Sequence, residues 1–152
     1  MKKVLFVLVL FIVLCIGSAV KAAPVDESIV VPPDAKCGQW WQLMNDQGWS
    51  DADIAKADRI MFRESKCMEE MHNKLDPTTI NGVKGSLGLF QINLFWLSKT
   101  VAYPQGFLQT MLKRELKPKD LFDPLTNIQA ARAIIRYNRA NGGCGWDAWK
   151  AC

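Results

Sequence analysis

The stretch from Ser50 to Met71 constrains the fold most strongly, because its apolar residues recur at the spacing of an amphipathic helix. One stripe of this helix contains Ile54, Ala57, Ile60, Met61, Cys67, Met68 and Met71. Glu64 falls inside the stripe, where an ionised carboxylate is rarely found without a partner. Glu64 is therefore either a paired structural residue or a general acid that burial keeps protonated until it donates to a leaving oxygen.

The rest of the chain is also patterned mainly as helices, which predicts a mostly α fold. Ser50 with Asp53 predicts the N-terminal cap of the first long helix. Asp123-Pro124 predicts the start of a second long helix, which ends at Asn141-Gly142-Gly143. The turn-rich segment 76–88 predicts a loop with a small β-hairpin beside it. Shorter helices are predicted for an Asp34-capped segment ending at Gly48 and for residues 94–101, 107–116 and 144–152.

The N-terminus predicts export. Lys2 and Lys3 precede an apolar run, and Val20-Lys21-Ala22 offers a cleavage site, so residues 1–22 are expected to be a signal peptide. Lipid attachment at Cys15 is the alternative, which the bulky preceding Leu14 disfavours. Residues 23–33 are expected to be a proline-containing linker, and residues 34–152 a single domain.

The charge balance argues against a nucleic-acid partner. The chain has 19 basic and 15 acidic residues, a net charge of +4, and three of the lysines lie in the expected signal peptide. The mature protein is then almost neutral, without the basic excess of a nucleic-acid-binding domain. We expect a monomer without a membrane association after signal cleavage.

Four cysteines remain after the signal peptide: Cys37, Cys67, Cys144 and Cys152. An even number in a short exported chain predicts two disulfides, and all three pairings remain open. An oxidising location, secreted or periplasmic, follows. No Cys-x-x-Cys motif occurs and His72 is the only histidine, so neither a metal nor a cofactor is expected.

Glu64-Ser65, the loop Gly85-Ser86-Leu87-Gly88-Leu89-Phe90-Gln91-Ile92-Asn93 and Trp96 together resemble the lysozyme-like superfamily. The resemblance is greatest to lytic transglycosylases of the soluble lytic transglycosylase (SLT) catalytic-domain type, with goose-type lysozyme as a near relative. It extends over residues 50–149 through Leu121-Phe122-Asp123-Pro124 and Gly145-Trp146, with Phe90 where the family usually has Met. It implies a lysozyme-like fold and cleavage of a glycan.

The resemblance also implies roles for individual residues. Glu64 is the expected catalytic acid, and the expected substrate-binding residues are Ser86, Gly88, Gln91, Asn93, Trp96 and Tyr137. Gly85 and Gly88 are expected to let the backbone approach the sugar. Gln91 and Asn93 have a second interpretation as amides that stabilise their own loop. Trp96 is the best sugar-stacking candidate among six tryptophans that otherwise suit a core, and Tyr103 is the alternative to Tyr137.

The position where animal-type lysozymes carry a second catalytic Asp is Ser86 in this chain. Asp76 is the nearest substitute, although Asp-Pro also suits a plain turn. A single carboxylate points to participation by the substrate's N-acetyl group and an anhydro-sugar product, as in lytic transglycosylases. Hydrolysis stays open, since goose-type lysozymes also use the single Glu, but Asn93 replaces an Asp of their loop.

The expected function is therefore cleavage of the β-1,4 bond between N-acetylmuramic acid and N-acetylglucosamine, with peptidoglycan glycan strands as the partner. Hydrolytic lysozyme activity, a non-catalytic glycan-binding role on the same fold, and activity on chitin are the alternatives.

Overall fold

The structure is a computed structural model that describes residues 28–152. The expected signal peptide, Cys15 and the first part of the linker lie outside the described residues. In chain order the elements are η1 (Gly38–Trp40), α1 (Trp41–Asp46), α2 (Asp51–Ser65), β1 (His72–Asn73), β2 (Thr79–Ile80), β3 (Val83–Lys84), β4 (Ser86–Leu87), β5 (Ile92–Asn93), η2 (Leu94–Leu97), α3 (Phe107–Leu112), η3 (Pro118–Phe122), α4 (Pro124–Ala140) and η4 (Asp147–Trp149), where η denotes a 3-10 helix. Helices dominate and the strands are short, an α structure with some β that agrees with the mostly α prediction.

Helix α2 begins where its cap predicts and ends earlier than its apolar stripe predicts. Ser50 Oγ accepts a hydrogen bond from the Asp53 backbone N–H at 3.3 Å. The helix ends at Ser65 rather than Met71, because Lys66 and Cys67 adopt left-handed backbone conformations with φ of 56° and 66°. This turn leads the chain out of α2 and places Cys67 beside Cys37. Met68, expected on the buried stripe, is consequently 49% exposed.

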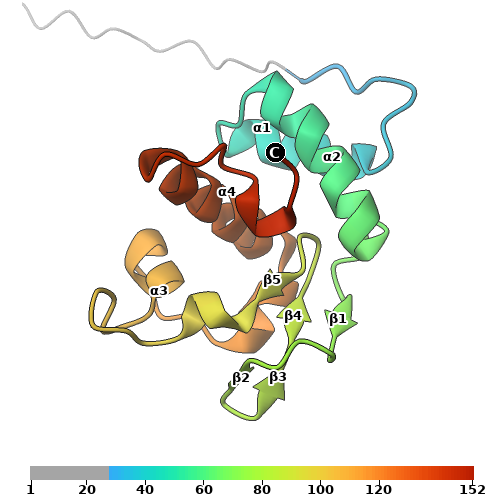
Figure 1. The fold of residues 1–152 in the computed structure, drawn as a ribbon. Helices are drawn as coiled ribbons and strands as arrows, with labels where there is room; N and C mark the ends of the chain where they lie inside the picture. The colour runs from blue at the N-terminus through green and yellow to red at the C-terminus, as the bar shows by residue number, and fades with distance from the viewer. Residues whose placement is uncertain (1–27) are drawn as a thin grey trace, which may run out of the picture.

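Helix α4 follows its sequence pattern at both ends. Asp123 Oδ2 accepts a hydrogen bond from the Thr126 backbone N–H at 2.8 Å, and Pro124 occupies the first helical position. The helix ends at Ala140, directly before Asn141. Its predicted apolar stripe is buried and consists of Ile128, Ala131, Ile134 and Ile135. Figure 1 shows α4 in the middle of the molecule, between the α1 and α2 pair and α3.

The shorter helices differ from prediction. Asp34 caps no helix, because η1 starts only at Gly38, after Cys37. The helix predicted over residues 94–101 is the single turn η2, which ends at Leu97. Helix α3 ends at Leu112, four residues before the predicted Leu116, because Lys113 takes a left-handed conformation with φ of 52°. The segment predicted over residues 144–152 contains the 3-10 turn η4.

Two small antiparallel sheets lie at the lower right of Figure 1. Strands β2 and β3 form the predicted hairpin, and Asn81 and Gly82 at its turn have φ of 48° and 77°. Positive φ at both turn residues is the arrangement that Asn-Gly favours in a two-residue hairpin. The second sheet has the strand order β1-β4-β5, and it contacts α4 through β5 and η3 through β4.

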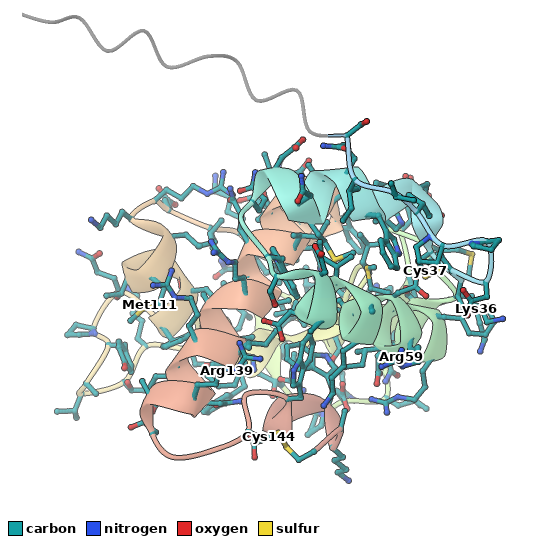
Figure 2. The ribbon with its side chains drawn as sticks, turned by 90° about the horizontal axis from the view of Figure 1, so that it is seen from above. Lys36, Cys37, Arg59, Met111, Arg139 and Cys144 are labelled. Atoms are coloured by element: carbon teal, nitrogen blue, oxygen red, sulfur yellow. A yellow bond between two sulfur atoms is a disulfide. The ribbon has the colours of Figure 1, made fainter. Side chains whose placement is uncertain are left out.

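The disulfides join Cys37 to Cys67 and Cys144 to Cys152, which resolves the open pairing. The first fastens the segment before η1 to the end of α2, where Figure 2 shows Lys36 and Cys37. The second closes the C-terminal segment around η4. Two disulfides in so small a chain are typical of an oxidising, exported compartment. Within residues 28–152, no helix has the length and apolar character needed to cross a membrane.

Candidate functional site

A polar cleft of about 330 Å³ lies between the end of α2, the β1-β4-β5 sheet and the C-terminal segment. Five of the seven predicted site residues line it: Glu64, Ser86, Gln91, Asn93 and Trp96. The other lining residues are Asn73, Asp76, Ile92, Ile134, Ala148, Trp149 and Lys150. Gly88 and Tyr137 are not among them. The cleft therefore joins residues that are far apart in sequence at one place.

The register of the sheet places three polar side chains in one row. In the antiparallel pairing, Ser86 on β4 lies opposite both Asn73 on β1 and Asn93 on β5. Directly opposed residues present their side chains on the same face of a sheet. All three residues line the cleft, whereas Leu87, the next residue on β4, is completely buried. The sheet thus places two amide side chains on the cleft, together with the buried hydroxyl of Ser86, which donates to Asp76.

Glu64 occupies the last turn of α2, beside the cleft. Its Oε1 accepts hydrogen bonds from Arg63 Nε at 3.0 Å and Arg63 Nη2 at 2.7 Å. The Glu64 side chain is 27% exposed, so it is partly buried and lies at the edge of the buried face of α2. The cause is the end of α2 at Ser65, which leaves the last turn at the rim of the cleft. Within residues 28–152, Glu64 Oε2 accepts no hydrogen bond from a protein donor.

The buried carboxylate of α2 is Asp58, which the sequence interpretation missed. Asp58 is 4% exposed and accepts hydrogen bonds from the backbone N–H groups of Lys36 and Cys37 and from Trp41 Nε1, at 2.7–2.9 Å. These donors satisfy its charge and attach the N-terminal segment to the helix. Its position four residues after Ile54 was the available signal, because that spacing places it on the buried face.

Asp76 is a second carboxylate on the same cleft. It accepts a hydrogen bond from the hydroxyl of Ser86, and both residues line the cleft with Glu64. Ser86 therefore occupies the position where animal-type lysozymes carry an Asp, and its hydroxyl binds the carboxylate of Asp76 instead. The pairing of β1 with β4 brings Asp76 near Ser86, so the substitute carboxylate considered from the sequence does lie on this cleft.

Gln91 and Asn93 both bond to backbone groups. Gln91 Nε2 donates to the carbonyl oxygens of Met71 and Gly88, each at 2.9 Å, and its buried Oε1 has no partner within the described residues. Asn93 Oδ1 accepts from the Phe95 N–H at 2.8 Å and so caps η2. Both amides thus stabilise their own loop, the second interpretation given above. Asn93 Nδ2 makes no hydrogen bond to another described residue.

Gly88 is required by internal packing. A Cβ at this position would lie 2.2 Å from both Asn127 Nδ2 and the Leu121 carbonyl oxygen, and its φ is 76°. Asn127 is completely buried and fastens the loop to α4: its Nδ2 donates to the carbonyl oxygens of Leu87 and Leu121, and its Oδ1 accepts from the Phe90 N–H. The glycine at position 85 has a similar role, since its Cβ would meet the Asn73 carbonyl oxygen.

Trp96 differs from the other tryptophans in lining the cleft while remaining half-buried. Its ring packs against Phe95, Phe107 and Tyr137, with centroid distances of 5.7, 5.0 and 6.2 Å. Tyr137 and Tyr103 belong to this aromatic cluster and line a neighbouring, mostly apolar hollow. Trp41, Trp49, Trp146 and Trp149 are buried in the core.

The C-terminal segment forms a wall of the cleft that the sequence interpretation did not anticipate. Ala148, Trp149 and Lys150 line the cleft. Trp149 Nε1 donates to the Phe90 carbonyl oxygen at 2.7 Å, and the Trp149 carbonyl oxygen accepts from Arg63 Nη2 at 2.6 Å. No local sequence signal identifies this contact, because it joins residues 86 positions apart.

Three residues of the kind that bind metals lie at the C-terminal disulfide. The sulfur atoms of Cys144 and Cys152 and a carboxylate oxygen of Asp147 lie within 4.8 Å of one another. Both sulfurs belong to the disulfide, so they are not thiolates able to bind an ion. His72 Nε2 lies 2.7 Å from the Lys84 carbonyl oxygen, and its ring packs on Phe122.

The cleft combines two carboxylates, amide and hydroxyl groups and an indole ring. This set suits a ligand rich in hydroxyl and amide groups, such as a glycan. No family model matches the chain, and neither a curated protein nor a solved structure is significantly similar to it.

Proposed function

We propose that this protein is an exported, lysozyme-like glycosidase that cleaves the β-1,4 bond between N-acetylmuramic acid and N-acetylglucosamine in peptidoglycan. The observation that carries the proposal is the position of Glu64, a partly buried carboxylate at a helix end, on the same cleft as the row of Asn73, Ser86 and Asn93. Its working location is secreted or periplasmic, in keeping with the two disulfides.

Glycosidic cleavage requires a proton on the leaving oxygen and stabilisation of an oxocarbenium-like centre. Glu64 supplies this proton as the glycosidic C–O bond breaks. The acetamido oxygen of the muramic acid attacks the anomeric carbon and forms a cyclic intermediate. Glu64, now ionised, then takes the proton of the sugar's own 6-hydroxyl group, whose oxygen displaces the acetamido group. The product is an anhydro-sugar, the outcome of a lytic transglycosylase.

The remaining cleft residues position the glycan. Asn93 uses its Oδ1 to cap η2, which leaves its Nδ2 for a sugar oxygen. The half-buried Trp96 ring offers an apolar platform for a sugar face. Arg63 fixes Glu64 Oε1, so the unbonded Oε2 is the oxygen that we assign to proton transfer.

Asp76 favours a second candidate, hydrolysis. A carboxylate on the same cleft as Glu64 can orient a water molecule or stabilise the cationic centre, as in glycosidases with two carboxylates. Mass spectrometry of the products separates the mechanisms: anhydro-muropeptides indicate transglycosylation, and reducing ends indicate hydrolysis. In the hydrolytic case Asp76→Asn abolishes cleavage, whereas in the transglycosylase case the variant still yields the anhydro product.

The test of the function measures the loss of turbidity of purified cell walls by the oxidised mature protein. Glu64→Gln should abolish the loss, and Glu70→Gln, an exposed acid that does not line the cleft, should retain it. Binding of both wild type and Glu64→Gln to pelleted walls without any cleavage would instead establish a non-catalytic glycan-binding protein. Chitin in place of cell walls tests the remaining substrate class.

A further inference from the structure

Lys150 is a cation on the wall of the cleft, in a constrained backbone position. It follows η4 with φ of 50°, a left-handed conformation that is uncommon for residues other than glycine. It lines the cleft together with Glu64 and Asp76 and is exposed to solvent. Within residues 28–152, no carboxylate lies within ion-pair distance of its ammonium group.

Three interactions hold the backbone that carries Lys150. Trp149 is anchored through its indole to the Phe90 carbonyl oxygen, and through its own carbonyl oxygen to Arg63. The disulfide between Cys144 and Cys152 closes the segment on both sides of η4. The side chain of Lys150 is flexible, but its starting point at the cleft is fixed.

The charges around the cleft make Lys150 the available cation. Arg63 is bonded to Glu64 and to the Trp149 carbonyl oxygen. Asp76 accepts from the hydroxyl of Ser86. Lys150 is the remaining charged group among the residues that line the cleft, and its ammonium is without an internal partner. An anionic group on a bound glycan therefore finds its counter-charge at Lys150.

We infer that Lys150 is a specificity-determining residue of this cleft, which recognises a carboxylate on the glycan. The inference rests on the proposed function and refines its substrate class. Muramic acid carries a lactyl ether that continues into an acidic peptide, whereas chitin has hydroxyl and acetamido groups alone. Lys150 therefore favours glycans with acidic substituents over neutral polymers of N-acetylglucosamine.

The experiment measures binding by isothermal titration calorimetry in a Glu64→Gln background, so that no probe is cleaved. The two probes are a tetrasaccharide muropeptide with free peptide carboxylates and neutral chitotetraose. The variants are Lys150→Gln, Lys150→Arg and Lys113→Gln. Lys113 is the matched control: it is also an exposed lysine after a helix, with φ of 52°, but it does not line the cleft.

We expect Lys150→Gln to raise the Kd for the acidic probe about three- to fivefold relative to the neutral probe, the scale of an exposed ion pair. Lys150→Arg and Lys113→Gln should retain the preference, and added salt should reduce it in the parent protein. An equal loss for both probes, or no loss, overturns the inference. Cleavage by the protein with Glu64 intact is measured separately. If that protein is inactive but the Lys150-dependent preference in binding is present, the proposed chemistry is refuted and the inference about Lys150 stands.

Discussion

Arg63 Nη2 lies 2.7 Å from Glu64 Oε1, and the same nitrogen donates to the carbonyl oxygen of Trp149 at 2.6 Å. One guanidinium therefore connects the candidate acid on α2 with the C-terminal wall of the cleft. The planar, multiply donating Arg side chain suits this double contact, and the single ammonium of a lysine does not reproduce it.

Arg63→Gln should lower the rate of cell-wall cleavage about tenfold, because Glu64 and the C-terminal wall lose their common anchor. The side chain of Arg63 is 50% exposed, so the melting temperature should fall by only a few degrees. Turbidity assays and thermal unfolding measure the two effects. Arg59→Gln on the same helix, an exposed residue outside the cleft, is the control. Equal activities of the two variants would refute the anchoring role.

Replacing both Cys144 and Cys152 with serine should lower activity more, for the stability that is lost, than replacing both Cys37 and Cys67 with serine. The bond spans 8 residues, for which loop-closure entropy gives a contribution of about 2.5 kcal/mol. The Cys37–Cys67 bond spans 30 residues and contributes about 3.6 kcal/mol on the same scale. Since the shorter loop carries Trp149 and Lys150, its opening should also impair binding at a temperature where the protein is folded. Denaturant unfolding and glycan binding test this, and unchanged binding contradicts the assigned wall.

Gly88→Ala should be more destabilising than Gly82→Ala, although both glycines have nearly the same φ, 76° and 77°. Position 82 has no atom within 4 Å of an added Cβ, so its cost is the left-handed conformation, about 1 kcal/mol. Position 88 adds a clash with Asn127 and the Leu121 carbonyl oxygen. We expect an additional loss of about 2 kcal/mol in the free energy of unfolding, measured by urea denaturation. Equal losses would contradict internal packing as the reason for Gly88.

Asp53 and Arg139 join the start of α2 to the end of α4 through two hydrogen bonds of 3.0 and 2.6 Å (Figure 2 labels Arg139). The hydrogen bond from Arg139 is the main reason that the pKa of Asp53 lies below its ordinary value, and the same pair raises the pKa of Arg139. A lowered carboxyl pKa stabilises the folded state above the unfolded-state pKa of about 4, and the effect is lost as the pH falls through the folded-state value.

Asp53→Asn should therefore reduce stability by about 0.5–1 kcal/mol at pH 7, a small value because the Arg139 side chain is 44% exposed. The difference from wild type should disappear as the pH approaches about 2. Chemical denaturation at a series of pH values measures it, with Asp51→Asn, an exposed acid at the start of the same helix, as the control. A difference that persists in acid would exclude the ion pair as its source.

Local signals in the sequence were sufficient for the starts of both long helices and for the presence of a small hairpin near the loop, because caps and turn residues act over a few positions. They did not reveal the end of α2 at Ser65, which depends on the left-handed turn that leads to the Cys37–Cys67 bond. Five predicted site residues line one cleft, and so does Asp76, which the sequence already indicates as the nearest substitute for a second carboxylate. Lys150 reaches the cleft through a long-range contact that no local pattern encodes. The buried Asp58 follows the helical spacing that drew attention to Glu64.

The central claim is that Glu64 donates the proton that breaks the glycosidic bond. The most direct measurement compares the products of wild type and Glu64→Gln on purified sacculi by mass spectrometry, after circular dichroism has confirmed that the variant is folded. The account predicts anhydro-muropeptides from the wild type and intact sacculi with the variant. Cleavage by Glu64→Gln at the wild-type rate would contradict it.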